Sequence, residues 1–183
     1  MALNADNVRV GGGPGGAVYS APTGTTLPVD ADAPVGAEFV DHGYLSEDGV
    51  TEATSRSVET IRAWQNAAVV REIPTEGDVT YSFTMIETTA DNVSLFYGDA
   101  VDTTDGSVRV RPTQVGDRRA FVIDVIDGEH VIRTVIPNGE VTERGEQVYV
   151  SGQAIGYPVT IRGYQDEDGV AATKYYSALV TGV

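Results

Sequence analysis

The sequence contains no cysteine, so disulfide bonds and thiolate metal sites are excluded. Only 12 basic residues, a single lysine among them (Lys174), stand against 27 acidic residues, and the net charge is −15. Without a basic patch or stripe, tight binding to nucleic-acid phosphates or to anionic lipid is not expected. No apolar run approaches the roughly 18 residues that a membrane helix needs, and the start lacks the regions of a signal peptide. We therefore expect an acidic, soluble protein that is not secreted by the general route.

Residues for catalysis or metal binding are equally scarce. The two histidines, His42 and His130, are far apart and each adjoins an acidic residue near an expected turn. No catalytic motif is present in the sequence. The remaining alternative is a catalytic triad whose residues are distant in sequence and are brought together by the fold. The acidic turns at 47–49 and 166–169 do not continue into a calcium-binding loop. We predict no enzymatic activity, no cofactor and no metal.

What the sequence does contain is β-type patterning. Around Tyr81, apolar and polar residues alternate, as they do in a strand with one buried face. Further runs of β-branched residues predict strands at 121–126, 131–136, 148–150, 159–162 and 174–180. Asp127-Gly128, Asn138-Gly139 and Asp168-Gly169 are typical hairpin dipeptides. The fold class predicted is mostly β, in a chain long enough for one domain with a real core.

One short helix is predicted, from Asp91 to Tyr97. Thr89 or Asp91 can cap its first turn, and Gly98 stands where a C-cap glycine belongs. The glycine run from Gly11 to Gly16 can hold neither a helix nor a strand interior. We therefore divide the chain into a flexible N-terminal arm, residues 1–16, and a single β domain, residues 17–183.

Three short motifs occur in a fixed order in the first third of the chain. They are AP-x-GTTLP-x-D from Ala21, F-x-x-x-GY-x-SEDGV from Phe39, and I-x-AW from Ile61. Together, at this spacing, they make the sequence similar to the N-terminal region of major tail proteins, the tail tube proteins, of tailed phages of actinobacteria. The resemblance is strong up to Trp64 and weaker beyond it.

The resemblance implies a phage tail-tube fold: a β-sandwich or barrel-like core of two packed sheets, one short α-helix, a long inter-subunit loop and an N-terminal arm. It also implies an extended hairpin, so we predict a long, bulged strand over 58–70. Copies of the chain would form six-membered rings that stack into a hollow tube, in a virion assembled in the host cytoplasm. A long flexible tail is favoured, with no immunoglobulin-like module after Val180.

Partners follow from the same resemblance. They are the chain itself, a tape measure protein in the lumen, and tail terminator and distal tail or baseplate proteins at the tube ends. Double-stranded DNA would pass without specific binding, and no membrane would be bound. The acidity alone could reflect a GC-rich or salt-loving source. In a DNA conduit it would also avoid phosphate attraction, and we expect a net acidic lumen.

The segment from Asp41 to Ser57 is predicted to contact neighbouring subunits or rings. It mixes apolar and polar side chains around an expected turn at Ser46–Gly49, as interfaces do, and we expect it to be mobile in a monomer. The candidate contact residues are Tyr44, Leu45, Glu47, Asp48, Val50, Thr51, Glu52 and Arg56. Trp64 is the candidate core or interface anchor.

A ligand-binding β-sandwich, such as a carbohydrate-binding module, is the alternative function. Nine tyrosines, among them Tyr81, Tyr175 and Tyr176, could form a stacking platform for sugars. An aromatic cluster on one exposed sheet face would favour this alternative. Flanking arms suited to neighbouring subunits would favour the tube.

Overall fold

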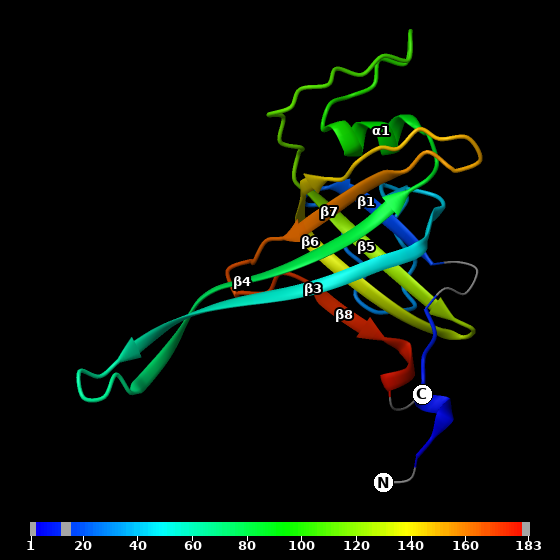
Figure 1. Ribbon diagram of the computed structural model, residues 1–183. Coiled ribbons are helices and arrows are strands. Elements are labelled where there is room, and N and C mark those ends of the chain that lie inside the picture. The colour runs from blue at the N-terminus through cyan, green and yellow to red at the C-terminus, as the bar shows by residue number, and fades with distance from the viewer. Residues whose placement is uncertain (1–2, 12–15, 181–183) are drawn as a thin grey trace.

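The computed structural model describes residues 3–11 and 16–180. The expected flexible glycine run therefore lies mostly outside the described residues. In these described residues the chain forms eight strands and one α-helix (Figure 1). In chain order the elements are η1 (Ala5–Asn7), β1 (Ala17–Pro22), β2 (Val40–Asp41), β3 (Leu45–Arg62), β4 (Val69–Met85), α1 (Ala90–Tyr97), β5 (Arg119–Asp127), β6 (His130–Arg144), β7 (Tyr157–Gly163), β8 (Thr173–Tyr176) and η2 (Ser177–Leu179).

All the strands belong to one antiparallel sheet, in the order β2-β1-β5-β6-β7-β4-β3, with β8 pairing the first half of β6. The mostly β class with one helix is thereby confirmed. Where two packed sheets were expected, a single sheet curls so that its two halves face each other. Val18 and Phe121, from β1 and β5, share a core with Phe83 and Ile161, from β4 and β7. Curling brings the apolar faces together without breaking the hydrogen-bonded path.

Strand β5 shows why its sequence is a continuous apolar run. Phe121 and Ile123 point into the main core, while Ala120 and Val122 point to the opposite face. That second face is covered by the connection between β1 and β2, which packs Leu27, Val35 and Phe39 against it. Both faces of β5 are buried, so its sequence does not alternate between apolar and polar residues.

The predicted helix is confirmed, one residue longer at its start. Thr89 is the N-cap, and its hydroxyl accepts a hydrogen bond from the Asn92 backbone at 3.2 Å. Gly98 closes the helix with φ of 69°. Leu95 and Phe96 enter the core. The helix therefore covers one open end of the curled sheet.

Two of the three hairpin dipeptides are at turns. Gly128 and Gly169, with φ of 61° and 79°, turn the chain between β5 and β6 and between β7 and β8. The prediction for Asn138-Gly139 is wrong, because both residues lie inside β6. A Cβ at Gly139 would come within 2.7 Å of Phe121 Cδ2. Glycine is needed at this position for close packing and does not form a turn.

Two strand predictions also need correction. Residues 148–150 lie in the connection between β6 and β7 and form no strand. Their apolar pattern finds no sheet edge there, because β7 is already paired with β6 on one side and β4 on the other. The last strand ends at Tyr176, after which residues 177–179 form a 3-10 helix.

The largest difference concerns residues 41–57, which were expected to be a mobile loop. Most of them belong to β3, which pairs with β4 from Leu45 to Arg62 and is therefore held within the chain. The expected turn at Ser46–Gly49 is a bulge. Leu45 pairs with Met85 and Val50 with Phe83, so the bulge adds residues on one side of the ladder only. The extended hairpin is confirmed, but residues 58–70 contain its turn as well as parts of both strands.

Candidate assembly surface

The β3–β4 hairpin extends far beyond the core of the protein. Near its base, Leu45, Val50 and Val79 pack against the main core. The hairpin projects away from the rest of the molecule (Figure 1). Beyond Val50, nearly every residue of β3 is exposed, and so is most of β4 before Asp78. The distal half of the hairpin is held mainly by backbone pairing and buries no face within its own chain.

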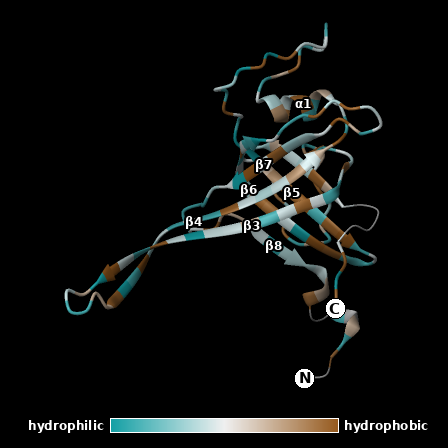
Figure 2. Cartoon of the chain, viewed as in Figure 1, coloured by the Kyte–Doolittle hydropathy of each residue, from teal (hydrophilic) through white to brown (hydrophobic). Residues whose placement is uncertain are grey.

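Apolar side chains gather at the far end of this hairpin. We define the tip as residues 61–71; its exposed apolar side chains are Ile61, Trp64, Val69 and Val70. Figure 2 shows hydrophobic bands on both strands next to the turn. Isolated exposed apolar residues are ordinary, but a cluster at the end of a projecting hairpin indicates a contact surface.

The turn presents Trp64 to solvent. The Ala63 N–H donates to the Ala68 carbonyl at 2.8 Å, and Arg62 Nη1 donates to the Ala67 carbonyl at 3.2 Å. Asn66 and Ala67 both adopt positive φ, which is unfavourable for alanine. Trp64 is 96% exposed, so it is not a core anchor. Its assignment as an interface anchor is the part that stays a prediction.

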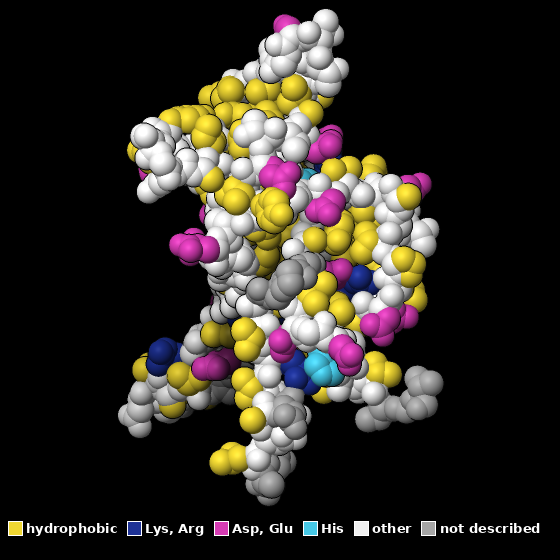
Figure 3. All heavy atoms as spheres, turned by 90° about the vertical axis from the view of Figure 1, so that its right-hand side faces the viewer, with side chains coloured by type: hydrophobic (Ala, Val, Ile, Leu, Met, Phe, Trp, Pro, Cys, Tyr) yellow, Lys and Arg dark blue, Asp and Glu magenta, His cyan; other side chains and the backbone are white. Residues whose placement is uncertain are grey.

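A groove lies at the other end of β3. It has a volume of about 550 Å³ and is bounded by the start of β3, the beginning of β1, the end of β5 and Gly11 of the N-terminal arm. Five candidate contact residues line it together: Tyr44, Leu45, Glu47, Asp48 and Val50. The side of the molecule in Figure 3 shows acidic side chains around exposed apolar ones. The other three candidates, Thr51, Glu52 and Arg56, lie further along the strand, where Glu52 pairs with Lys174 of β8.

A buried polar network joins β1, helix α1 and His42, the residue that follows β2. His42 Nδ1 lies 2.7 Å from Asn92 Oδ1, and His42 Nε2 lies 2.9 Å from Ser20 Oγ. The Asn92 side-chain nitrogen donates to the backbone carbonyl of His42. The Asn92 side-chain oxygen is therefore the acceptor for the N–H at His42 Nδ1. Burial lowers the pKa of His42, an effect reinforced by the nearby Arg119 charge and opposed by the hydrogen bond to Asn92.

The serine, histidine and asparagine of this network are arranged in the order of a catalytic triad. Ser20 and Asn92 are 0% exposed and His42 is 1% exposed, so no substrate can reach the hydroxyl. The network fixes helix α1 to the sheet at β1. Sequence reasoning placed His42 at a turn, and nothing local to it signals these distant partners.

A second buried group is the ion pair between Arg133 and Asp124, on the facing strands β6 and β5. The guanidinium donates to both carboxylate oxygens at 2.7 Å, and its third nitrogen donates to the carbonyls of Asp30 and Ala33. The pair therefore ties the covering connection to the sheet. Sequence analysis missed it, although the Asp127-Gly128 turn fixes the register that sets these two residues opposite each other.

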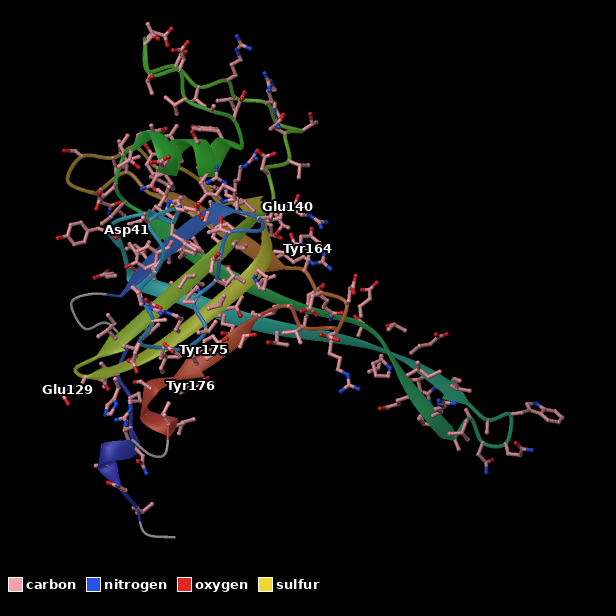
Figure 4. The ribbon with its side chains drawn as sticks, turned by 180° about the vertical axis from the view of Figure 1, so that it is seen from behind. Asp41, Glu129, Glu140, Tyr164, Tyr175 and Tyr176 are labelled. Carbon is pink, nitrogen blue, oxygen red and sulfur yellow. The ribbon has the colours of Figure 1, made fainter. Side chains whose placement is uncertain are left out.

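The tyrosines considered as a ligand platform do not share an exposed face. Tyr81 is buried in the core, and Tyr175 packs partly against the second core. Tyr164 lies apart from Tyr175 and Tyr176, which follow each other in β8 (Figure 4). The Arg118 guanidinium stands 4.1 Å from the Tyr164 ring centre, and burial, with a hydrogen bond to Glu140, raises the pKa of Tyr164. The arrangement does not favour sugar stacking.

Within residues 3–11 and 16–180, no three histidine or acidic side chains come together as a metal site would require. At the acidic turn 166–169, Asp166 Oδ1 accepts hydrogen bonds from the backbone of Asp168 and Val170, which closes the turn itself.

None of the helices in the described part of the chain has the length and apolar character to span a bilayer.

The exposed apolar tip of the hairpin is a surface suited to contact with another protein chain. The sequence matches the phage tail tube protein family over residues 1–180, and the chain belongs to that family. It is thus a structural component of a phage tail, part of the virion, and its family implies a non-enzymatic role.

Solved structures also resemble this chain. A protein chain from the virion of a native gene transfer agent particle aligns with 96% of this chain and 99% of its own length. The two share 9% sequence identity, with a TM-score of 0.40. Among curated proteins, none matches the sequence. The family assignment rests on the sequence match.

Proposed function

We propose that this chain forms homohexameric rings that stack into a hollow tube, the conduit for double-stranded DNA when the phage infects its host. The observation that carries the proposal is the β3–β4 hairpin, whose distal half is exposed on all sides and ends in an apolar tip. A monomer gains nothing from this surface. A family member that assembles into a tube can bury it against a neighbour.

The free edge of β3 supports the same proposal. This strand of 18 residues ends the sheet path, so the backbone groups on its outer side, which come from every second residue, have no partner strand within the described chain. Long unprotected edges invite pairing with another chain and are normally blocked in monomeric proteins. In a ring, the edge would be covered by the next subunit. The candidate contact residues Tyr44 to Arg56 all lie along this strand or directly before it.

The charge of the chain suits passage of DNA. A ring of six copies carries six times the charge of −15, and we propose that its lumen is net acidic. Basic groups along the lumen would hold phosphates through counterion release, and an acidic wall avoids this. A tape measure protein would occupy the lumen during assembly. Tail terminator and distal tail proteins would close the two ends of the tube.

The N-terminal residues 1–16 are proposed to act as an arm on the domain of residues 17–183. Val8 and Val10 are exposed and find no apolar cover in the described chain. The Val10 backbone N–H donates to Asp127 Oδ2 at 3.2 Å, which holds this end of the arm beside the β5–β6 turn. A neighbouring subunit would cover the exposed valines.

Shortening the hairpin tests the proposal. Thr60 and Glu72 are paired across the hairpin, so residues 61–71 can be replaced by Asn-Gly without altering the remaining ladder. Because the removed side chains are exposed, the variant should keep the free energy of unfolding of the natural chain within about 1 kcal/mol. A variant that lacks residues Leu45 to Thr54 would be a poorer test, because Leu45 and Val50 pack against the core. A loss of tubes in that variant could then result from misfolding as well as from lost contacts between subunits.

Negative-stain electron microscopy and native mass spectrometry provide the assay. The natural chain should form hollow tubes or hexamers at high concentration, and the shortened chain should remain monomeric. Failure of the natural chain to form rings or tubes would overturn the proposed function. Normal tubes from the shortened chain would show that the hairpin is not the assembly element.

A further inference from the structure

We propose that the hairpin tip of one copy docks into the groove at the start of β3 of a second copy, with Arg62 and Arg71 facing Glu47 and Asp48, and Trp64 entering between apolar walls. The inference rests on the proposed function and names the two surfaces that meet. It concerns residues at opposite ends of the same strand.

Charge distribution is the first argument. The tip, residues 61–71, contains Arg62 and Arg71 and no acidic residue, so its charge is +2. Since the whole chain carries −15, the remainder carries −17. Within the described chain, neither arginine forms an ion pair, and neither Glu47 nor Asp48 does. A basic tip on an otherwise acidic body is drawn to an acidic surface of another copy.

Shape and apolar character are the second argument. The groove holds about 550 Å³, and its walls include Tyr44, Val50 and Val125. Tyr44 is 76% exposed, although its backbone N–H is held at 2.7 Å by Glu87 Oε1. An indole side chain buries roughly 150–250 Å² in such a site. An aromatic anchor in an apolar pocket with a charged rim is the usual composition of an energetic hot spot.

The one other acidic residue that lines the groove is already neutralised. Asp124 lies at its floor, where it is 8% exposed and paired with Arg133. Glu47 and Asp48 are exposed at the rim and are left to attract a cation from outside. The groove therefore offers two unpaired carboxylates, which match the two arginines of the tip.

The geometry requires a second copy as the occupant. Between Val50 at the groove and Arg62 at the tip there are about 40 Å of paired strand, at roughly 3.3 Å per residue. A hairpin paired along this length cannot fold back onto its own groove. Two different surfaces meeting head to tail form a heterologous contact, which repeats from copy to copy and so closes a ring or extends a filament.

Charge reversal in the full-length chain tests the pairing. One variant carries Arg62→Glu and Arg71→Glu, a second carries Glu47→Lys and Asp48→Lys, and a third combines all four changes. Glu167→Lys with Asp168→Lys is the control, because it changes the net charge by the same amount as the groove variant at a distant turn. All of these positions are exposed, so every variant should fold.

Trp64 gives a readout that does not depend on tube shape. It is the only tryptophan, so its emission should shift to the blue as the natural chain is concentrated at low salt, and shift back as salt screens the charges. Each two-site variant should need at least tenfold more protein for the same shift. The control should behave like the natural chain, and the fourfold variant should recover most of the loss.

The possible results separate this inference from the proposed function. Tubes formed with Trp64 still exposed, a control as defective as the groove variant, or no recovery in the fourfold variant would each overturn the inference while the tube function stands. A blue shift that follows the charge swap without tubes or hexamers would support the docking and overturn the proposed function. A natural chain whose Trp64 emission does not change with concentration overturns the inference.

Discussion

Replacing Arg133 by alanine should destabilise the protein more than any other single polar substitution suggested by this structure. The side chain is 5% exposed and makes hydrogen bonds to both oxygens of Asp124, which is 8% exposed. Removing the guanidinium leaves a buried carboxylate without a counter-charge. Breaking such a pair from one side costs about 3–5 kcal/mol. A typical domain has only about 5–15 kcal/mol of stability in total.

A second effect adds to this cost. Arg133 also donates to the carbonyls of Asp30 and Ala33, and so it fixes the connection that covers β5 through Leu27, Val35 and Phe39. Without these bonds two part-buried carbonyls lose their donor, and the covering segment becomes easier to detach. Hydrogen exchange in β5 should then accelerate more than exchange in β4.

Urea unfolding followed by circular dichroism measures the first effect, and hydrogen exchange measures the second. The matched variant is Arg133→Met with Asp124→Leu, which removes both charges and fills the space with apolar atoms. Its free energy of unfolding should return to within about 1–2 kcal/mol of the natural chain. If Arg133→Ala costs less than about 1 kcal/mol, or if the double variant is as unstable as the single one, the reasoning is refuted.

Three further predictions concern other parts of the chain. Because burial lowers the pKa of His42 from its usual 6.5, the contribution of this residue to stability should be complete above about pH 6.5 and should fall as the pH drops below it, by up to about 1.4 kcal/mol per pH unit. The variant His42→Gln should flatten this pH profile in thermal melts, and an unchanged profile would contradict the assignment. Gly139→Ala should lower the free energy of unfolding in urea by about 1–3 kcal/mol, since the new Cβ would overlap Phe121. Gly106→Ala is the control, because Gly106 lies in an open turn where a Cβ meets no neighbour and only the backbone conformation is unfavourable. Trp64→Ala should leave the melting temperature of the monomer unchanged but prevent tube formation by electron microscopy; a lower melting temperature would mean that the side chain has a structural contact.

Local chemistry made several elements predictable from the sequence. Helix α1 was found because Thr89 and Gly98 mark its two ends, and both act on backbone groups within a few residues. The turns at Gly128 and Gly169 were found for the same reason. The β5–β6 register follows from the first of these turns, so the pairing of Asp124 with Arg133 was within reach of sequence reasoning. The tail tube family was also recognisable, from motifs in the first third of the chain.

Other features depended on neighbours far away in the sequence. Gly139 has the same local pattern as a hairpin turn, but Phe121 and Ile161 crowd it inside a strand. Residues 148–150 have the composition of a strand, but β7 has no free edge to accept them. His42 is adjacent to polar residues in sequence, and only the approach of β1 and α1 buries it. A sequence pattern reports the preference of a segment, and long-range pairing decides whether that preference can be satisfied.

The same distinction applies to the assembly surface. The composition of residues 41–57 indicated an interface without revealing whether they form a loop or a strand, because edge strands that meet another subunit carry the same mixed pattern. Trp64 could not be assigned to core or surface, since a tryptophan suits both. The sequence by itself determined the β class, the helix, two turns and the family. Only the tertiary structure decided that β3 is a paired edge strand, that its tip projects beyond the core, and that Glu47 and Asp48 border a groove at its other end, because each of these depends on which strands are left without a neighbour.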